Sequence, residues 1–162
     1  MNAPHFHLLL NHIPVIGISF GLILFTISNL FRSISLERGG IILFILSAIM
    51  AIPSYLTGEG AEDAVEKIAG LDSAMIEHHE TWAGTYIWFV VVLGVLSCFV
   101  FILSLRKWPY IQYAYVSLMF VALSCVGISL PVANSGGEIR HTEIRQNSSA
   151  AIDQPVKVED ND

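Results

Sequence analysis

Four long apolar stretches divide the chain, and polar or charged residues bound each of them. They run over residues 13–31, 41–56, 85–105 and 111–132. A helix needs about 20 apolar residues to cross the hydrocarbon core of a bilayer, and only the second stretch falls clearly below this length. Because backbone groups must be hydrogen-bonded inside lipid, each stretch is predicted to be a membrane-spanning helix.

Short links between the stretches predict how these helices are arranged. Residues 32–40 join the first two stretches, and residues 106–110 join the last two. Connections of this length join antiparallel neighbours, so we expect two helical hairpins. Gly17 and Gly21 form a GxxxG pattern that predicts close contact with another helix. The expected fold is all-α, an integral membrane four-helix bundle that occupies residues 1–145 as one domain.

A longer loop, residues 57–81, separates the hairpins and has a helical pattern of its own. Small and apolar residues recur in it at helical spacing, while Glu62, Asp63 and Glu66 take the other face. Gly70 is the expected end of this short helix, and Asp72 is the expected N-cap of a helix that continues into the third span. The small and apolar positions are Ala61, Ala64, Val65, Ile68 and Ala69.

The distribution of positive charge predicts the orientation in the membrane. The chain has 8 Lys and Arg residues, and half of them lie in the two short links: Arg32, Arg38, Arg106 and Lys107. Cytoplasmic loops are enriched in Lys and Arg, so we expect both links in the cytoplasm. Both termini and the 57–81 loop then lie on the outer side of the membrane. Aromatic residues near the expected interfaces agree, namely Trp82, Tyr86 and Trp88 outside and Trp108, Tyr110 and Tyr113 inside.

Composition supports a membrane protein and excludes several other classes. Of the 162 residues, 54% are hydrophobic, and the mean hydropathy is +0.62. The first apolar stretch lacks a basic segment and a small-residue cleavage site, so we interpret it as a retained span rather than a signal peptide. No dinucleotide motif or array of nucleophile and general base stands out, and no nucleic-acid partner is expected. Residues 146–162 are polar and acidic, which predicts a disordered tail, either inert or a flexible acidic contact.

The two cysteines, Cys98 and Cys125, lie inside apolar stretches without a CxxC or CxxCH pattern. Covalent attachment of c-type haem is therefore not expected. At the rise of an α-helix, Cys98 lies about 20 Å and Cys125 about 10 Å below the outer end of its span. We expect two small core residues rather than a disulfide or a metal-binding pair.

The histidines are distributed unevenly along the chain. They come from three separate parts: the beginning of the first span, the entry to the third span and the segment after the fourth. The expected fold brings these parts together on the periplasmic side, and this convergence is the main indication of function. The six residues are His5, His7, His12, His78, His79 and His141.

Helical spacing indicates which histidines point into the bundle. Ser19 and Thr26 follow His12 at intervals of seven. Polar residues on membrane helices normally face the bundle interior, so we expect His12 to point inward. His79 shares a face with apolar and aromatic residues, so it is also expected to point inward. His78 is rotated by about 100° from His79 and is expected to be a boundary residue, as is His5.

Several residues near the expected cluster each have two interpretations. Gly136 and Gly137 either let the backbone turn sharply or let it approach a flat group closely. Arg140 and Arg145 are either surface charges or partners for an anionic group such as a haem propionate. Glu80 is either solvated or orients a histidine.

The segments HLLLNHIPVIG, YLTGEGAEDAVEKIAG…IEHHE and GGEIRHTEI cover most of residues 5–145. Together they resemble an uncharacterised bacterial family of small four-helix membrane proteins that are suspected of binding b-type haem. That family has a paired-histidine pattern of the HPxLVHFP kind in helix one. This chain has Asn-His-Ile-Pro at residues 11–14 where the family has Val-His-Phe-Pro, so it resembles a divergent subgroup. The resemblance implies His7, His12, His79 and His141 as haem-iron ligands, with His78 as the alternative to His79.

Haem held by two histidines needs two neutral imidazoles from different elements, which face each other across an apolar slot. Four inward histidines at one face can supply one or two b-type haem groups. The pairing we expect is His12 with His79 and His7 with His141. In this interpretation the two glycines let the macrocycle approach the backbone, and Arg140 binds a propionate.

The expected function is electron transfer at the periplasmic face. Transfer across the bilayer needs cofactors near both faces, and no histidine is expected on the cytoplasmic side. We therefore expect a b-type haem protein, or a subunit of a larger respiratory complex. It would exchange electrons with quinol or a membrane oxidoreductase and with a periplasmic cytochrome. Whether it is an enzyme stays open. The alternatives are a copper, zinc or iron site that uses histidines and Glu80, and a structural or assembly subunit.

Overall fold

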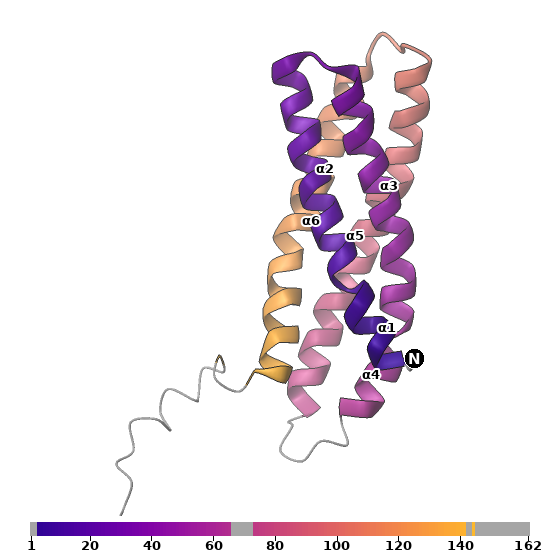
Figure 1. The fold of residues 1–162 in the computed structure, drawn as a ribbon. Helices are drawn as coiled ribbons and strands as arrows, with labels where there is room; N and C mark the ends of the chain where they lie inside the picture. The colour runs from indigo at the N-terminus through magenta and orange to yellow at the C-terminus, as the bar shows by residue number, and fades with distance from the viewer. Residues whose placement is uncertain (1–2, 66–72, 142–143, 145–162) are drawn as a thin grey trace, which may run out of the picture.

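The computed structural model describes residues 3–65, 73–141 and 144, and the elements in these residues are all α-helices. Four long helices form a bundle, with two short helices at one end of it (Figure 1). The expected all-α four-helix architecture is confirmed. In chain order the helices are α1 (Ala3–Leu10), α2 (His12–Phe31), α3 (Ile34–Leu56), α4 (Gly58–Val65), α5 (Ser73–Leu105) and α6 (Ile111–Arg140).

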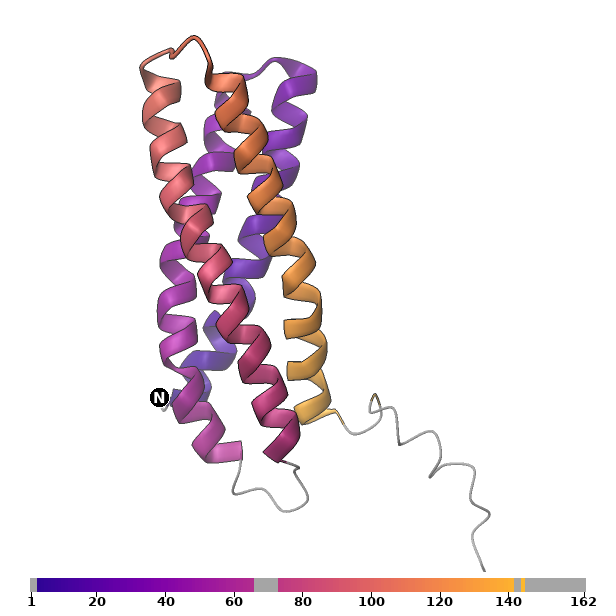
Figure 2. The ribbon, with the colours of Figure 1, turned by 180° about the vertical axis from the view of Figure 1, so that it is seen from behind.

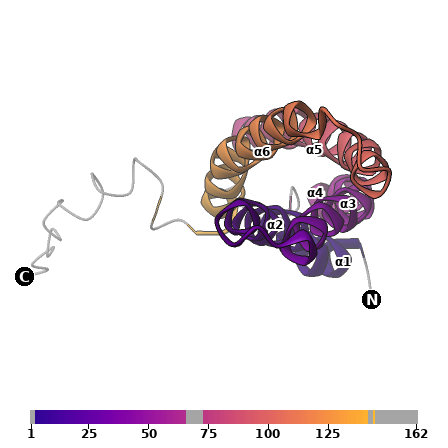
Figure 3. The same cartoon turned by 90° about the horizontal axis from the view of Figure 1, so that it is seen from above.

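Two helical hairpins make up the bundle, as the short links predict. The connection between α2 and α3 and the connection between α5 and α6 lie at the same end, opposite α1 and α4 (Figure 1). From behind, α5 and α6 run side by side (Figure 2). Seen along the bundle, α2 lies beside α3 and α5 beside α6 around a common interior (Figure 3). The two links therefore form one end of the molecule, called here the link end, and α1 with α4 marks the other.

Four helical segments are long and apolar enough to cross a membrane: Pro4–Phe31, Ile34–Leu56, Ser73–Leu105 and Ile111–Ile139. All four continue beyond the apolar stretches of the sequence. α3 already includes Glu37 and Arg38, and α5 begins before Glu77 and Glu80. Hydropathy shows only where the side chains are apolar. The backbone hydrogen bonds of a helix also form where the side chains are polar, so a helix can extend beyond its apolar stretch. The apolar pattern therefore locates the helices but not their ends.

The loop between the hairpins contains a helix, as its spacing predicts. α4 follows α3 directly and has an acidic first turn with Glu59. The expected helix end Gly70 and the expected N-cap Asp72 lie outside the described residues, as does the expected tail over residues 146–162.

Glycine allows α2 and α3 to approach each other closely. A Cβ atom on Gly40 would lie 2.7 Å from the carbonyl oxygen of Gly21 and 2.9 Å from the backbone nitrogen of Phe25. A Cβ on Gly17 would overlap the hydroxyl oxygen of Ser47. Backbone atoms cannot move aside as a flexible side chain can, so a side chain is excluded at Gly40. The close contact predicted by the GxxxG pattern of Gly17 and Gly21 is confirmed.

Apolar side chains fill the bundle and also cover its outside. Trp88 is 72% exposed and Phe120 is 71% exposed, and many other large apolar side chains face outward. Helices that are apolar on all sides are typical of membrane spans, so the fold is compatible with a multi-pass membrane protein. The interior is formed by Ile18, Phe25, Ile41, Phe44, Val90, Leu93, Val100, Leu118, Ala122 and Cys125.

Both cysteines are free thiols, so the expectation of no disulfide is confirmed. Cys125 is buried in the core, as expected, whereas Cys98 is exposed. Its neighbour Ser97 is the residue of α5 that faces the interior at this level. The hydroxyl of Ser97 is satisfied by the Leu93 carbonyl, at 2.6 Å in its own helix, which allows a polar residue to take the buried position.

At the link end, the side chain of Glu37 joins three helices. The Ser104 hydroxyl of α5 donates a hydrogen bond to Glu37 Oε1 at 2.9 Å, and the Tyr115 hydroxyl of α6 donates to the same oxygen. Tyr115 also packs edge-to-face against Phe25 of α2, with ring centroids 5.3 Å apart. This contact was not predicted, because Glu37 falls in an expected link rather than in an expected helix.

The glycine contact gives a direct test of the packing. Gly40→Ala is expected to lower the free energy of unfolding by about 1–3 kcal/mol, because the methyl group would meet the backbone of α2. The measurement is the thermal transition of the purified protein in detergent, followed by circular dichroism.

Gly39→Ala is the matched control for this test. A Cβ at Gly39 would meet only Leu24 Cδ1, at an ordinary 3.8 Å. Alanine is also about 0.5–1 kcal/mol more favourable than glycine inside a helix. We therefore expect an unchanged or higher transition temperature. Equal transitions for the two variants would contradict the packing described here.

Candidate functional site

His7 lies on α1 and is held against the end of α3. Its Nδ1 is 2.9 Å from the carbonyl oxygen of Ser54, in the last turn of α3, where carbonyls lack partners within the helix. A carbonyl can only accept, so Nδ1 carries the proton and donates it. Gly58 packs beside the same ring, since a Cβ there would lie 3.7 Å from Cε1 of His7. The ring therefore has a fixed position, and in its neutral form the proton is on Nδ1 and Nε2 is unprotonated.

His79 lies on α5 and is held against α6 in the same manner. Its Nδ1 is 3.0 Å from the hydroxyl oxygen of Ser135. That hydroxyl is also 2.8 Å from the carbonyl oxygen of Pro131, and when it donates its proton there it accepts from Nδ1 of His79. The ring also packs closely against α6, because a Cβ on Gly136 would be 3.0 Å from Cε1 of His79. The inward orientation expected for His79 is confirmed.

His7 and His79 come from helices that are far apart in the sequence, and both belong to the end of the bundle away from the links. In both rings Nδ1 is engaged by an acceptor, which leaves Nε2 available to accept a hydrogen bond or to bind a metal ion. Two oriented, neutral imidazoles from separate helices make the His7–His79 pair the best-defined candidate site.

Two buried polar atoms on the same helices lack a hydrogen-bond partner within the described residues. One is the hydroxyl of Tyr86, a residue that is 7% exposed and lies seven positions after His79 on the same face of α5. The other is Oδ1 of Asn11, four positions after His7. An unpaired buried polar atom costs about 1–3 kcal/mol. These atoms mark places where a bound group or an ordered water would be stabilised.

The other four histidines are exposed, although all six belong to the end of the bundle away from the links. His141 caps the end of α6, and its backbone N–H donates to the Gly137 carbonyl at 2.9 Å. His78 packs edge-to-face on Trp82, with ring centroids 6.4 Å apart, which agrees with its expected place at the boundary. His12 and His141, which the sequence pairs with His79 and His7, are thus both exposed.

His12 is exposed at the first residue of α2, contrary to its expected inward orientation. The expectation assumed that the polar residues Ser19 and Thr26 must face the interior. Their hydroxyls instead donate to carbonyls one turn earlier in the same helix, at 2.8 and 2.7 Å. Because these local bonds satisfy the hydroxyls, the stripe need not face the interior: Ser19 is half-buried and Thr26 is exposed. The buried face of α2 consists of Pro14, Ile18, Gly21, Phe25 and Ser28.

The glycine pair of α6 only partly meets its prediction. Gly136 does let the backbone approach a flat group, and that group is the imidazole of His79. A sharp turn is wrong, since Gly136 and Gly137 both lie within the regular helix α6. The side chain of Arg140 and the whole of Arg145 lie outside what the structure describes. Glu80 is exposed, and the residue that orients His79 is Ser135 instead.

Sequence reasoning missed the two groups that hold the imidazoles. Ser135 is buried, but it lies about 100° around α6 from the buried face formed by Leu118, Ala122, Cys125 and Ser129. The spacing of that face therefore does not identify it, and the polar stripe chosen instead includes Asn134 and Gly127, which are exposed. The Ser54 carbonyl belongs to the backbone, so no pattern of side chains could have indicated it.

In the described part of the chain, no group of three or more His, Cys, Asp and Glu side chains is placed to hold a metal ion. Comparison with protein-family models, with curated proteins and with solved structures finds no match for this chain. The chemistry of the site therefore rests on the geometry of its own residues.

The hydrogen bonds predict one tautomer for both histidines. When both rings are neutral, ¹⁵N NMR of histidine-labelled protein is expected to show His7 and His79 protonated at Nδ1. Ser135→Ala removes the acceptor for His79 and should shift its tautomer balance while leaving His7 unchanged. Ser129→Ala is the control, because that hydroxyl donates only within α6, to Val126 at 2.7 Å. Protonation of His79 at Nε2 in the unmodified protein would contradict this geometry.

Proposed function

We propose that this chain is a membrane protein that binds b-type haem, with His7 and His79 as the residues that would hold its iron. The observation that supports this best is that two imidazoles at the same end of the bundle are each held at Nδ1, which leaves Nε2 available in the neutral ring. A porphyrin supplies the other ligands of its iron, so two neutral histidines are the complete contribution required from the protein. A bare metal ion would need more side chains than this pair offers.

The surroundings of the pair support a flat, largely apolar group. Gly136 lets the ring of His79 pack closely against α6, and Ile76 is buried one turn earlier on α5. The unpaired atoms of Tyr86 and Asn11 provide polar contacts at the edge of such a group. When bound, haem supplies a one-electron couple. The chain holds it, orients it through the two anchored rings and excludes water with the apolar interior.

We infer that electrons are exchanged at the periplasmic face. The pair lies at the opposite end of the bundle from Arg32, Arg38, Arg106 and Lys107, and such clusters of positive charge remain in the cytoplasm. Acidic α4, next to His7, favours a basic partner such as a soluble cytochrome. Quinol or a membrane oxidoreductase in the inner membrane would be the other partner.

Haem content tests the ligand assignment. The purified protein is expected to give a b-type signal in a dithionite-reduced minus oxidised spectrum, quantified as the pyridine haemochrome. His7→Ala and His79→Ala should each lose most of the haem, because each removes an axial ligand. His5→Ala and His78→Ala are matched controls on the same helices with exposed side chains, and they should retain it.

Two results would contradict the proposal in different ways. Haem loss in His12→Ala and His141→Ala, with retention in His79→Ala, would replace the proposed ligands with others. A flat spectrum from folded protein grown with ample haem would rule out the haem function. Elemental analysis would then separate a metal site from a structural subunit.

The membrane orientation has its own test. In a background with Cys98→Ala and Cys125→Ala, single cysteines are placed at Ser73 and Ser35, both exposed and at opposite ends of the bundle. A membrane-impermeant thiol reagent applied to cells with a permeabilised outer membrane is expected to label Ser73→Cys and not Ser35→Cys. Labelling of Ser35→Cys alone would invert the proposed topology.

A further inference from the structure

The turn between α2 and α3 contains an unusual backbone position. Arg32 caps α2 in the left-handed conformation, with φ 48° and ψ 41°, and its N–H bonds to the Ser28 carbonyl. Glycine usually occupies this position, because other residues are strained there. A strained residue persists where the surrounding structure holds it, and such residues gather at binding sites. The side chain at position 32 is therefore a candidate for a function of its own.

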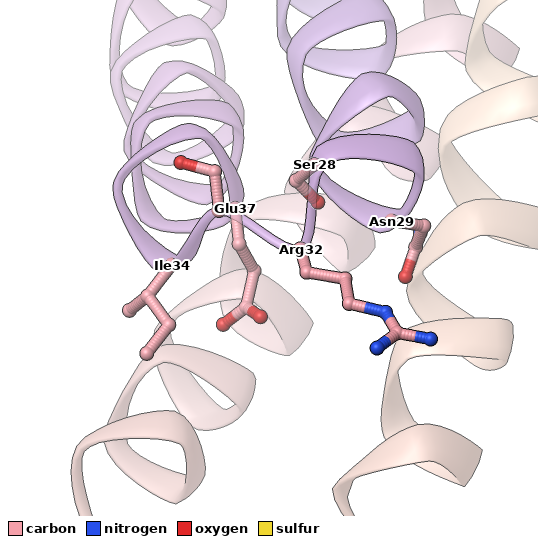
Figure 4. Close-up of a pocket in the computed structure, with 6 residues that line it drawn as sticks. Ser28, Asn29, Arg32, Ile34 and Glu37 are labelled. Carbon is pink, nitrogen blue, oxygen red and sulfur yellow. The ribbon is translucent and has the colours of Figure 1, made fainter.

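A polar pocket of about 190 Å³ lies beside this turn (Figure 4). A water molecule in the liquid takes up about 30 Å³, so the pocket has room for a small polar group. Figure 4 shows the guanidinium of Arg32 and the carboxylate of Glu37 extending on the same side of the turn. The lining residues are Ser28, Asn29, Arg32, Ser33, Ile34 and Glu37.

The two charged groups of the pocket do not neutralise each other. No hydrogen bond or ion pair connects the Arg32 guanidinium to another described residue, and none joins it to Glu37. Glu37 Oε1 accepts from Ser104 and Tyr115, which fixes the carboxylate while Oε2 has no such contact within the described chain. The pocket is thus lined by a cation and a carboxylate, each able to bind an opposite charge.

We propose that this pocket binds the headgroup of a phospholipid that carries both a phosphate and a primary ammonium, namely phosphatidylethanolamine. Arg32 and the hydroxyl of Ser33 would bind the phosphate, and Glu37 would accept from the ammonium. A purely anionic headgroup would be repelled by Glu37. A trimethylated ammonium has no N–H to donate to it. The proposal does not depend on haem binding.

The position of the pocket fits a lipid rather than a soluble molecule. It lies where α2 ends and α3 begins, at the end of two apolar spans and therefore at headgroup depth in a membrane. Leu30, Phe31 and Ile34 beside it are 78%, 68% and 61% exposed and would contact the acyl chains. A free phosphate ester shares the headgroup chemistry, so the experiment must separate these sources.

Thermal stability of delipidated protein in detergent micelles provides the test. Added phosphatidylethanolamine is expected to raise the unfolding temperature in a saturable manner, and phosphatidylglycerol and phosphatidylcholine should do so clearly less. Soluble phosphoethanolamine should compete with the lipid. Equal or greater protection by phosphatidylglycerol, or full competition by inorganic phosphate alone, would overturn the proposal.

A pair of glycine variants isolates the arginine side chain. Arg32→Gly removes the guanidinium and relieves the strained backbone. The lipid-free variant should therefore unfold at the same temperature as the unmodified protein or at a higher one. Its apparent affinity for phosphatidylethanolamine should fall about tenfold or more, as the loss of a charged hydrogen bond implies. Lys107→Gly is the matched control, with φ 51° at the same end but outside the pocket, and it should keep the lipid response. The role of Arg32 in binding the phosphate would be overturned if both variants lost the same affinity for phosphatidylethanolamine, or if Arg32→Gly lost none.

Glu37→Gln tests the ammonium half of the proposal. Glutamine keeps an acceptor oxygen for Ser104 and Tyr115 but removes the charge. The preference for phosphatidylethanolamine over phosphatidylglycerol should then disappear, and an unchanged preference would overturn the role of Glu37. Because both lipids are compared on the same variant, a lower starting stability does not affect the result.

Discussion

The rest of the structure depends on the contact between the backbones of α2 and α3. At Gly21 and Gly40 these helices come so close that a single methyl group would meet backbone atoms. This contact sets how α2 crosses α3, and therefore where α1, which continues from α2, meets the far end of α3. His7 on α1 can reach the Ser54 carbonyl only because α3 ends beside it. A packing constraint near one end of the bundle thus positions a histidine at the other.

The apolar pattern was sufficient to predict the four helices, their hairpins and the gathering of all six histidines at one end. It was not sufficient to predict the direction of individual side chains. His12 illustrates the reason: Ser19 and Thr26 indicated an interior face, yet their hydroxyls bond to their own helix. A hydroxyl that a carbonyl one turn earlier can satisfy gives little information about which face is buried. The glycines of α2, which need a close neighbour, were the more reliable guide.

The groups that orient the candidate ligands were less predictable than the ligands themselves. Helical spacing identified His79, because its face of α5 also carries the buried residues Ile76 and Tyr86. Its partner Ser135 lies on another helix, and the Ser54 carbonyl becomes available only because α3 ends there. Contacts of this kind follow from how helices are placed relative to one another, which local sequence does not specify. The same applies to Glu37, whose partners come from α5 and α6.

Both orienting groups of the histidine pair are neutral, and this has a chemical consequence. A carboxylate bonded to Nδ1 would raise the basicity of the ring and add a negative charge to the ligand. A carbonyl and a serine hydroxyl fix the ring equally well without placing a charge at the edge of an apolar bundle, where an unpaired charge is costly. Glu80 follows His79 directly, but it is exposed and is not the hydrogen-bond partner. In the proposed haem protein, neutral partners would make the imidazoles weaker electron donors than carboxylate-bonded ones. Reduced iron would then be favoured over oxidised iron.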